Sequence, residues 1–317
     1  MTKLYRGNHV AVILPCFNEV AVIGTVILAF RTALPESDIF VFDNDSTDGT
    51  AEAARAAGAV VRNVPQRGKG NVVRRQFADV DADVYVMADG DGTYDASQSR
   101  ALVDMLLDNG LDMVVGTRQT EGQGGEYRRG HVLGNRVLTG TVASIFGRGF
   151  SDMLSGYRVL SRRFVKSFPA LSKGFEIETE LTIHALELRA PYGEMPTLYG
   201  SRVEGSSSKL STMRDGLLIA EMIVRLFARE RPRQLYMTLG AVVAIAAMLL
   251  ALPVIYEFFE TGMVPRFPTA ILAGLGVVAG LLLGATAVIL DSVVTGRREV
   301  KRLRYLEIPA PKPADGQ

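Results

Sequence analysis

The chain has 317 residues, enough for one large domain or two smaller ones. Its formal net charge of +1 provides no global field that would favour nucleic acid, so no nucleic-acid partner is expected. The single cysteine, Cys16, excludes an intramolecular disulfide and a multi-cysteine zinc site, and three scattered histidines argue against a histidine-rich metal site.

Short apolar runs alternate with segments of helical periodicity through the first part of the chain. The apolar runs predict buried strands, and the segments between them predict helices. Such alternation is typical of an α/β fold with a mainly parallel, doubly wound (Rossmann-like) sheet. The expected strands are 9–14, 38–42, 60–64, 84–88 and 112–116, and the expected helices are 20–33, 51–57, 66–78 and 95–108.

Polar residues follow the first two expected strands. Asn18 suits the N-cap of the next helix and Glu19 its first turn. Residues 43–50 form an acidic loop that suits hydrogen bonds to the ribose or base of a nucleoside. Part of that loop must serve as cap and turn, for which Ser46, Thr47 and Asp48 are the better candidates.

The residues that follow two further expected strands are suited to binding a phosphate or a metal ion. Lys69, between two glycines at a helix start, can meet a phosphate, although the pattern is short and is not a P-loop. Asp89 and Asp91 directly follow an apolar strand, and Gly90 and Gly92 leave room for a close approach to the backbone. Paired carboxylates at this edge of a sheet suit Mg²⁺ or Mn²⁺ on a diphosphate, and the alternative is a simple turn.

The alternation of strands and helices is less regular from residue 117 to residue 210. Arg118 ends a strand, and a glycine-rich loop over 121–126 follows it. Glu178 and Glu180 suit the first turn of a helix over 175–189. The remaining expectations are a helix over 132–146, an extended segment over 194–199 and a Ser/Gly loop over 200–210 that carries Arg202 and Lys209.

Residues 235–256 and 269–290 are almost wholly apolar, and each run is long enough for a helix to cross ~30 Å of hydrocarbon. A short polar connector joins them, which predicts a membrane hairpin with the lipid bilayer as a partner. Basic residues flank both outer ends, so by the positive-inside rule the catalytic domain and both termini are cytoplasmic, in a multi-pass protein of the cell membrane. The alternative is a buried helical pair of a soluble protein.

The expected domains follow from this hydropathy pattern. They are a catalytic domain over 1–210, amphipathic juxtamembrane helices over 211–234, the hairpin over 235–295 and a basic cytoplasmic tail over 296–317. The amphipathic segment suits either the membrane surface or a position packed on the catalytic domain. A lone hairpin often packs with copies of itself, so a homo-oligomer is one of the alternatives.

Several short motifs, in this order, resemble those of family 2 glycosyltransferases with the GT-A fold. They are Pro-Cys-Phe-Asn-Glu at 15–19, the acidic loop at 43–50, Asp-Gly-Asp at 89–91, Gly-Thr-Arg at 116–118, Asp-Met-Leu-Ser-Gly-Tyr-Arg at 152–158 and the loop at 202–209. The likeness covers roughly residues 9–210 and is greatest to the polyprenyl-phosphate sugar transferases, which share a membrane hairpin. Asn44 and Asp45 depart from the Asp-Gly that the family has in the second motif.

The resemblance implies inverting, metal-dependent transfer of a sugar from a UDP- or GDP-sugar to a polyprenyl phosphate at the cytoplasmic membrane face. Asp89 and Asp91 would hold Mg²⁺ or Mn²⁺. Arg118, with Arg128 or Arg129, would hold the acceptor phosphate, because the arginine fork matches phosphate oxygens. The implied donor and metal site consists of Pro15, Phe17, Asn18, Glu19, Asp43, Asp89, Gly90, Asp91, Thr93, Arg118, Arg202 and Lys209.

Other functions compete with this one. A processive polysaccharide synthase would carry a Gln-x-x-Arg-Trp motif, which the chain lacks because it contains no Trp. A membrane-anchored transferase acting on a glycan or protein hydroxyl would need a carboxylate base near Asp152. A membrane-tethered, non-catalytic nucleotide-binding scaffold is the alternative from another class.

Overall fold

The computed structural model describes residues 3–120, 140, 150–174, 176–200, 228 and 231–312. The chain forms two compact units. The first, which we call the N-terminal unit, contains Met1–Ile219 together with Val300–Gln317. The second, the helical unit, is Ala220–Glu299.

The N-terminal unit is built on a mixed, mostly parallel sheet, as the sequence predicts. Within the described residues the sheet has seven strands in the order β3-β2-β1-β4-β6-β5-β7. Adjacent strands of the sheet pair in parallel, except that β6 is antiparallel to β4 and to β5. The strands are β1 (Val10–Cys16), β2 (Asp38–Asp43), β3 (Val60–Asn63), β4 (Val84–Met87), β5 (Met113–Thr120), β6 (Arg158–Ser161) and β7 (Tyr192–Tyr199).

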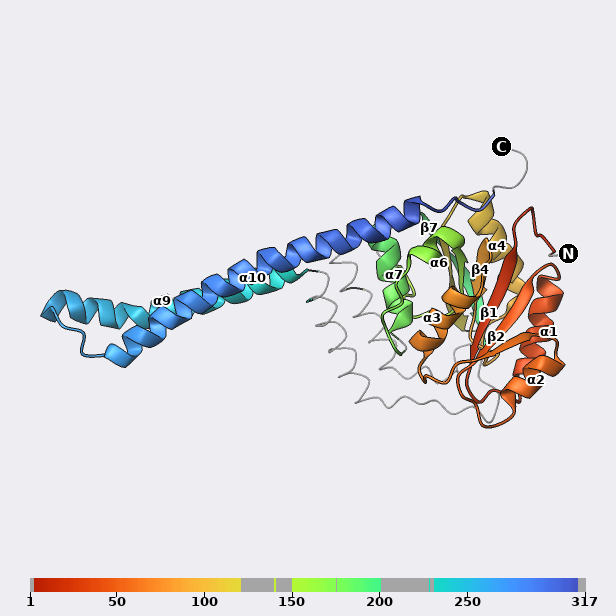
Figure 1. Cartoon of the computed structure of the whole chain (residues 1–317), viewed down its shortest axis with the longest axis horizontal. Coiled ribbons are helices and arrows are strands. Elements are labelled where there is room, and N and C mark those ends of the chain that lie inside the picture. The colour runs from red at the N-terminus through yellow and green to blue at the C-terminus, as the bar shows by residue number, and fades with distance from the viewer. Residues whose placement is uncertain are drawn as a thin grey trace. The chain divides into compact units, whose positions relative to one another are not determined.

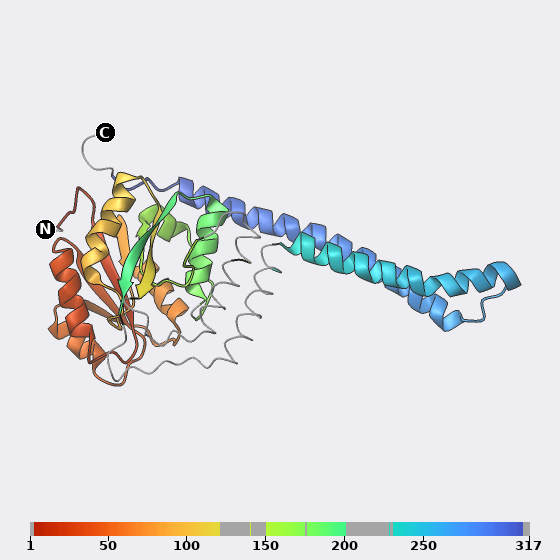
Figure 2. The same ribbon diagram turned by 180° about the vertical axis from the view of Figure 1, so that it is seen from behind.

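Helices cover both faces of this sheet (Figure 1; Figure 2). One face carries α1 (Ile23–Ala33), α2 (Thr50–Ala56), a short 3₁₀ turn η1 (Ala96–Gln98) and α4 (Ser99–Asp108). The other face carries α3 (Lys69–Asp79), α6 (Arg162–Ser167) and α7 (Ile177–Leu188). A doubly wound arrangement of this kind buries both faces of the central strands, which explains why β1 and β4 are buried along their whole length.

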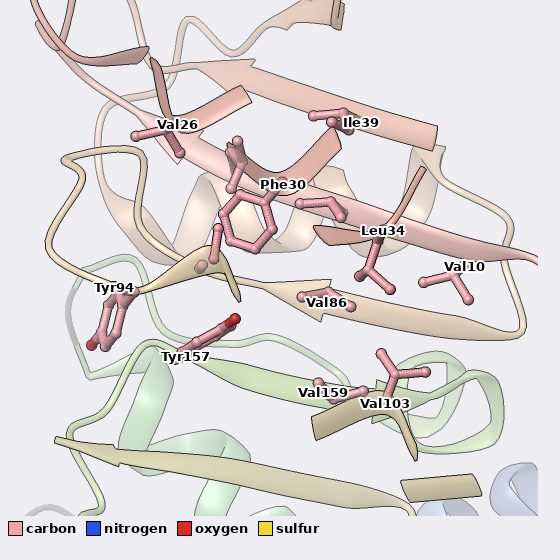
Figure 3. Close-up of a cluster of buried hydrophobic side chains, with 14 of the residues drawn as sticks. Val10, Val26, Phe30, Leu34, Ile39, Val86, Tyr94, Val103, Tyr157 and Val159 are labelled. Carbon is pink, nitrogen blue, oxygen red and sulfur yellow. The ribbon is translucent and has the colours of Figure 1, made fainter. Parts of the chain in front are cut away.

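The core beneath α1 and α4 is apolar and continuous (Figure 3). Phe30 of α1 and Leu34, which follows the helix, pack toward Val86 of β4 and Val159 of β6 (Figure 3). Each of these side chains is at most 1% exposed. The ring of Phe30 meets that of Tyr157 edge to face, with centroids 6.3 Å apart. Close packing of this face fixes the strand ends that carry the predicted site.

Three elements, α1, β6 and α6, differ from the sequence prediction. The helix expected over 20–33 begins only at Ile23. β6 and α6 were not expected, because a strand of four residues within a segment rich in Ser, Gly and Arg has too short an apolar run to stand out. The glycine-rich loop over 121–126 and most of the helices expected over 132–146 and 211–234 lie outside the described residues. The last three residues of the second range belong to α9 (Pro232–Thr261).

The helical unit contains α9 (Pro232–Thr261) and much of α10 (Phe267–Leu306), each long and apolar enough to cross a membrane. They lie side by side in both views (Figure 1; Figure 2). Small residues let them approach closely: a Cβ added to Gly240 would lie 2.8 Å from the Gly280 carbonyl oxygen. The expected spans 235–256 and 269–290 fall inside these two helices.

The chain beyond residue 299 returns to the N-terminal unit. The Lys301 ammonium pairs with Glu187 at 2.7 Å, and the Tyr305 hydroxyl donates to Asp112 Oδ2 at 2.5 Å. Lys312 exchanges hydrogen bonds with the side chain of Asn8 at 2.9 and 3.1 Å. Residues 300–312 of the segment expected to be a basic tail are therefore a packed part of this unit.

Candidate active site

The loops that carry the predicted site residues meet at one edge of the sheet. β1, β2, β4 and β5 point in the same direction, because β6 is antiparallel to both β4 and β5. Their carboxyl ends therefore share an edge, which is where open α/β sheets bind ligands. The segment before β6 reaches the same edge, since an antiparallel strand begins where its neighbours end.

The loop after β1 is joined to the loop after β2. The Asn18 N–H donates to Ser46 Oγ at 2.9 Å, and Asn18 Oδ1 accepts from the Thr47 N–H at 3.0 Å. Asn18 has a φ of 56°, which asparagine tolerates better than most residues. The prediction that Asn18 caps α1 is wrong, because its side chain is used between the loops and α1 begins later.

The other residues of this loop have separate places. Pro15 is buried in β1 and its carbonyl accepts the Gly90 N–H at 3.3 Å. The Phe17 ring lies 4.7 Å from the Arg67 guanidinium carbon. The Glu19 N–H donates to Thr50 Oγ1 at 2.8 Å, and Glu19 precedes the first turn of α1 in which the sequence placed it.

Asp43 ends β2 with a carboxylate that is 4% exposed. Its Oδ2 accepts from the Ser46 N–H at 3.2 Å. Its Oδ1 is buried and has no hydrogen-bond partner among the described residues. Because an unpaired buried acceptor is unfavourable, this oxygen is a candidate acceptor for a hydroxyl or N–H of a ligand.

Asn44 fixes the loop that leads into α3. Its Nδ2 donates to the carbonyls of Val64 and Gln66 at 2.9 and 2.8 Å, and its Oδ1 accepts from the Gly68 N–H at 2.8 Å. A carboxylate could not make the two donations. The departure of this position from the family motif therefore has a structural reason in this chain.

Asp89 and Asp91 follow β4 in different surroundings. Asp91 is 6% exposed, and its Oδ1 accepts from the Thr93 N–H at 3.1 Å and from the Thr93 hydroxyl at 2.6 Å. The Asp89 side chain is 28% exposed and faces Lys69. The space beside Gly90 is taken by the protein itself, because a Cβ there would collide with Cys16 Sγ.

Lys69 bridges two carboxylates at this edge. Its ammonium pairs with Asp89 Oδ1 and, at 2.5 Å, with Glu178 Oε1. Burial opposes the charge on Lys69, but the two carboxylates outweigh it and raise its pKa above the usual range. Burial raises the pKa of Glu178. Glu178 does lie in the first turn of α7, as predicted, but its link to Asp89 through Lys69 was not expected.

Arg118 and Asp152 form a fork-to-fork pair. Arg118 Nε and Nη2 donate to the two Asp152 oxygens at 2.8 Å each, and the Arg118 backbone N–H adds a bond of 3.2 Å. Burial opposes ionisation of Asp152, yet these bonds lower its pKa below the usual range. Arg118 was expected at this edge; its partnership with Asp152 was not.

The segment before β6 is held from beneath by a fully buried arginine. Arg158 donates to the carbonyls of Ser155 and Met153 at 3.0 and 2.7 Å and to Thr182 Oγ1 at 3.0 Å. Burial lowers the pKa of Arg158 to about 10, so it stays charged at neutral pH. The Tyr94 hydroxyl accepts the Gly156 N–H at 2.8 Å, near Tyr157 (Figure 3).

Three predicted site residues, Arg129, Arg202 and Lys209, lie outside the described residues, as does Arg128. The others, from the ends of β1, β2, β4 and β5, are brought to the same edge. Lys69 and Glu178 join them there.

A family model for glycosyl transferase family 2 matches residues 11–168. Glycosyltransferase AglJ of Haloferax volcanii is 33% identical over 302 residues, which cover 95% of this chain and 99% of AglJ. The chain belongs to glycosyltransferase family 2. A dolichol-phosphate mannosyltransferase of Pyrococcus furiosus is 26% identical over 208 residues, which cover 62% of this chain and 58% of the mannosyltransferase.

This family 2 glycosyltransferase has the GT-A fold of solved relatives. Glucosyl-3-phosphoglycerate synthase of Mycobacterium tuberculosis, solved with Mn²⁺, UDP-glucose and phosphoglyceric acid, superposes with a TM-score of 0.57. It is 25% identical, and the match covers 70% of this chain and 79% of that one. The likeness supports a nucleotide-sugar as the donor.

The oxygen donors of Asp89 and Asp91 fit a hard divalent ion such as Mg²⁺ or Mn²⁺. The described ranges contain no group of three or more His, Cys, Asp or Glu side chains that could hold a metal by itself. Water and donor diphosphate oxygens would have to supply further ligands, which is the usual manner of binding Mg²⁺.

Proposed function

We propose that this glycosyltransferase moves a sugar from a nucleotide-sugar to a polyprenyl phosphate at a membrane surface, with inversion at the anomeric carbon. The observation that carries the proposal is that the N-terminal unit contains residues from both sides of the helical unit. It contains Met1–Ile219, which precede α9, and Val300–Gln317, which are the end of α10 and the chain after it. Two membrane crossings would return the chain to the side it left, so a spanning hairpin would keep this unit on one face.

Two further observations support a lipid acceptor. α9 and α10 are long and apolar enough to cross a membrane. A relative named for dolichol phosphate shares 26% identity over 208 residues. An enzyme that must meet a polyprenyl phosphate benefits from being held at the bilayer, where that substrate is concentrated.

The electrostatics of Asp152 favour a phosphate acceptor over a hydroxyl. A hydroxyl acceptor needs a general base, and a base works best with a pKa near the working pH. The bonds from Arg118 lower the pKa of Asp152, which makes it a poor base. A phosphate monoester, with a second pKa near 6, is already mostly dianionic at pH 7 and needs no such base.

In the proposed reaction an acceptor phosphate oxygen forms a bond to the anomeric carbon as the bond from that carbon to the donor diphosphate breaks. The Asp43 Oδ1 acceptor would orient the nucleoside, and Asp152 would fix the Arg118 guanidinium toward the acceptor side. Asp89 and Asp91 would hold the Mg²⁺ or Mn²⁺ that, when bound, stabilises the negative charge of the departing nucleoside diphosphate. Arg129, Arg202 and Lys209 remain proposals from the family motifs.

The test is transfer of radiolabelled sugar by the full-length protein in detergent, with a panel of UDP- and GDP-sugars. Each donor is offered polyprenyl phosphate or a water-soluble glycan. The expected product is a butanol-extractable, mild-acid-labile lipid. Transfer only to the glycan would overturn the lipid acceptor, and no transfer from any donor would favour a non-catalytic scaffold.

A further inference from the structure

The backbone on both sides of Lys69 is fixed by close packing. A Cβ on Gly68 would collide with the Lys173 carbonyl, and a Cβ on Gly70 would collide with the Ser172 carbonyl. The Gly70 N–H donates to the Lys173 carbonyl at 3.1 Å. The first turn of α3 is therefore pressed against the segment that leads into α7, which holds Lys69 in one place.

The Lys69 ammonium is packed between the two carboxylates with little access to water. The side chains of Lys69 and Glu178 are 9% and 4% exposed. Gly156 closes the cluster, because a Cβ there would lie 2.9 Å from Asp89 Oδ2 and 3.1 Å from Lys69 Nζ. Charges that are shielded from water interact more strongly than charges at the surface.

Among the described residues, the cluster has more carboxylates than ammonium groups. Asp89 and Glu178 face one ammonium, and Glu178 Oε2 is buried with no hydrogen-bond partner in the part of the chain that the structure describes. Asp91 adds a further carboxylate two residues from Asp89. The edge can therefore accept a cation, but its most exposed carboxylate, Asp89, already has one beside it.

We propose that Lys69 is the resident counter-ion of Asp89 in the donor-free enzyme and makes binding of the divalent ion depend on the nucleotide-sugar. This rests on the proposed metal role of Asp89. An ion that arrives alone meets a carboxylate already paired and a neighbouring positive charge that repels it. A donor diphosphate adds negative charge at the same edge and offsets that repulsion. Lys69 acts through Asp89 and is a positioning residue that sets the order of binding.

The test is Mn²⁺ binding to the full-length protein in detergent, measured from the electron paramagnetic resonance signal of free Mn²⁺. Wild-type protein should bind Mn²⁺ weakly alone and more tightly with UDP. Lys69→Met should tighten the Kd for Mn²⁺ without UDP by about tenfold or more, because a close positive charge is removed. The gain in affinity from UDP should then become smaller but not vanish, because the diphosphate oxygens still supply ligands to the ion.

The matched control is Lys173→Met, which removes the same charge from an exposed lysine nearby and should leave both values unchanged. An unchanged or weaker Kd in Lys69→Met, with Cys16 still protected from thiol reagents, would overturn the inference. If Lys69→Met does not fold, Glu178→Gln decides the question. It leaves the ammonium to Asp89 alone and should weaken Mn²⁺ binding without UDP; tighter or unchanged binding would contradict it.

These measurements need no acceptor lipid, so they can fail independently of the proposed function. Lipid transfer together with an unaltered Mn²⁺ Kd in Lys69→Met would remove only the counter-ion role. If wild-type protein bound no Mn²⁺ even with UDP, both the metal role of Asp89 and this inference would be wrong.

Discussion

A substitution of Asp43 is the most direct single-residue test of the proposed nucleotide site. Its buried Oδ1 has no partner within the described ranges, although its other oxygen is bonded to Ser46. Asp43→Asn keeps the shape but removes the charge. It should weaken UDP or GDP binding about tenfold, because a hydrogen bond to a charged acceptor contributes about 1.5–3 kcal/mol. Isothermal titration calorimetry would measure the Kd for UDP or GDP in both proteins.

The control for Asp43 lies on the same strand. Asp38 begins β2 at the opposite edge, where its half-exposed carboxylate faces His9. Asp38→Asn should leave the nucleotide Kd unchanged. Equal affinities for wild-type protein and Asp43→Asn would show that this oxygen does not contact the nucleotide.

The strands and helices differ in how far their positions and contacts could be predicted from the sequence. The positions of Asp43, Asp89 and Arg118 were predictable because each stands at the end of an apolar run in the sequence, which is a local pattern. The bridge from Lys69 to Glu178 was not, since it joins the starts of two helices that are distant in sequence. β6 was missed for a similar reason: its place between β4 and β5 depends on long-range pairing.

The end of α10 is a second feature that the sequence did not reveal. Asp112 is fully buried and accepts hydrogen bonds from Ser161, Arg163 and Tyr305. Tyr305→Phe removes one donor and keeps the ring beside Arg163. The free energy of unfolding should fall by about 1 kcal/mol, the usual worth of one hydrogen bond.

Unfolding of these variants can be followed with a fluorogenic thiol reagent, because Cys16 is the only cysteine and is buried. The control is Tyr192→Phe, whose ring stacks on Phe150. That change should alter stability by no more than about 0.5 kcal/mol. Identical unfolding curves for Tyr305→Phe and wild type would mean that the Tyr305 bond does not stabilise this unit.

For the whole molecule, the proposed hairpin predicts on which side of the membrane each residue lies. Met263, 67% exposed in the connector between α9 and α10, should be outside the cell, and Ser97 of the N-terminal unit should be inside. In intact cells, a membrane-impermeant thiol reagent should label Met263→Cys and not Ser97→Cys. Cys16 is buried and adds little background.

Opening the membrane should make Ser97→Cys reactive as well, which shows that the site is accessible. Labelling of both variants in intact cells, or of neither, would contradict a hairpin with the catalytic unit in the cytoplasm. The protein could then be a soluble transferase with a buried helical pair.

The proposed acceptor is a phosphate carried by a lipid. The most direct measurement compares sugar transfer to a polyprenyl phosphate with transfer to the polyprenol of equal chain length, using purified full-length protein in lipid nanodiscs. We expect a glycosylated lipid, detected by mass spectrometry, from the polyprenyl phosphate alone. Comparable transfer to the alcohol would contradict it, because the enzyme would then need the general base that Asp152, bonded to Arg118, is poorly suited to be.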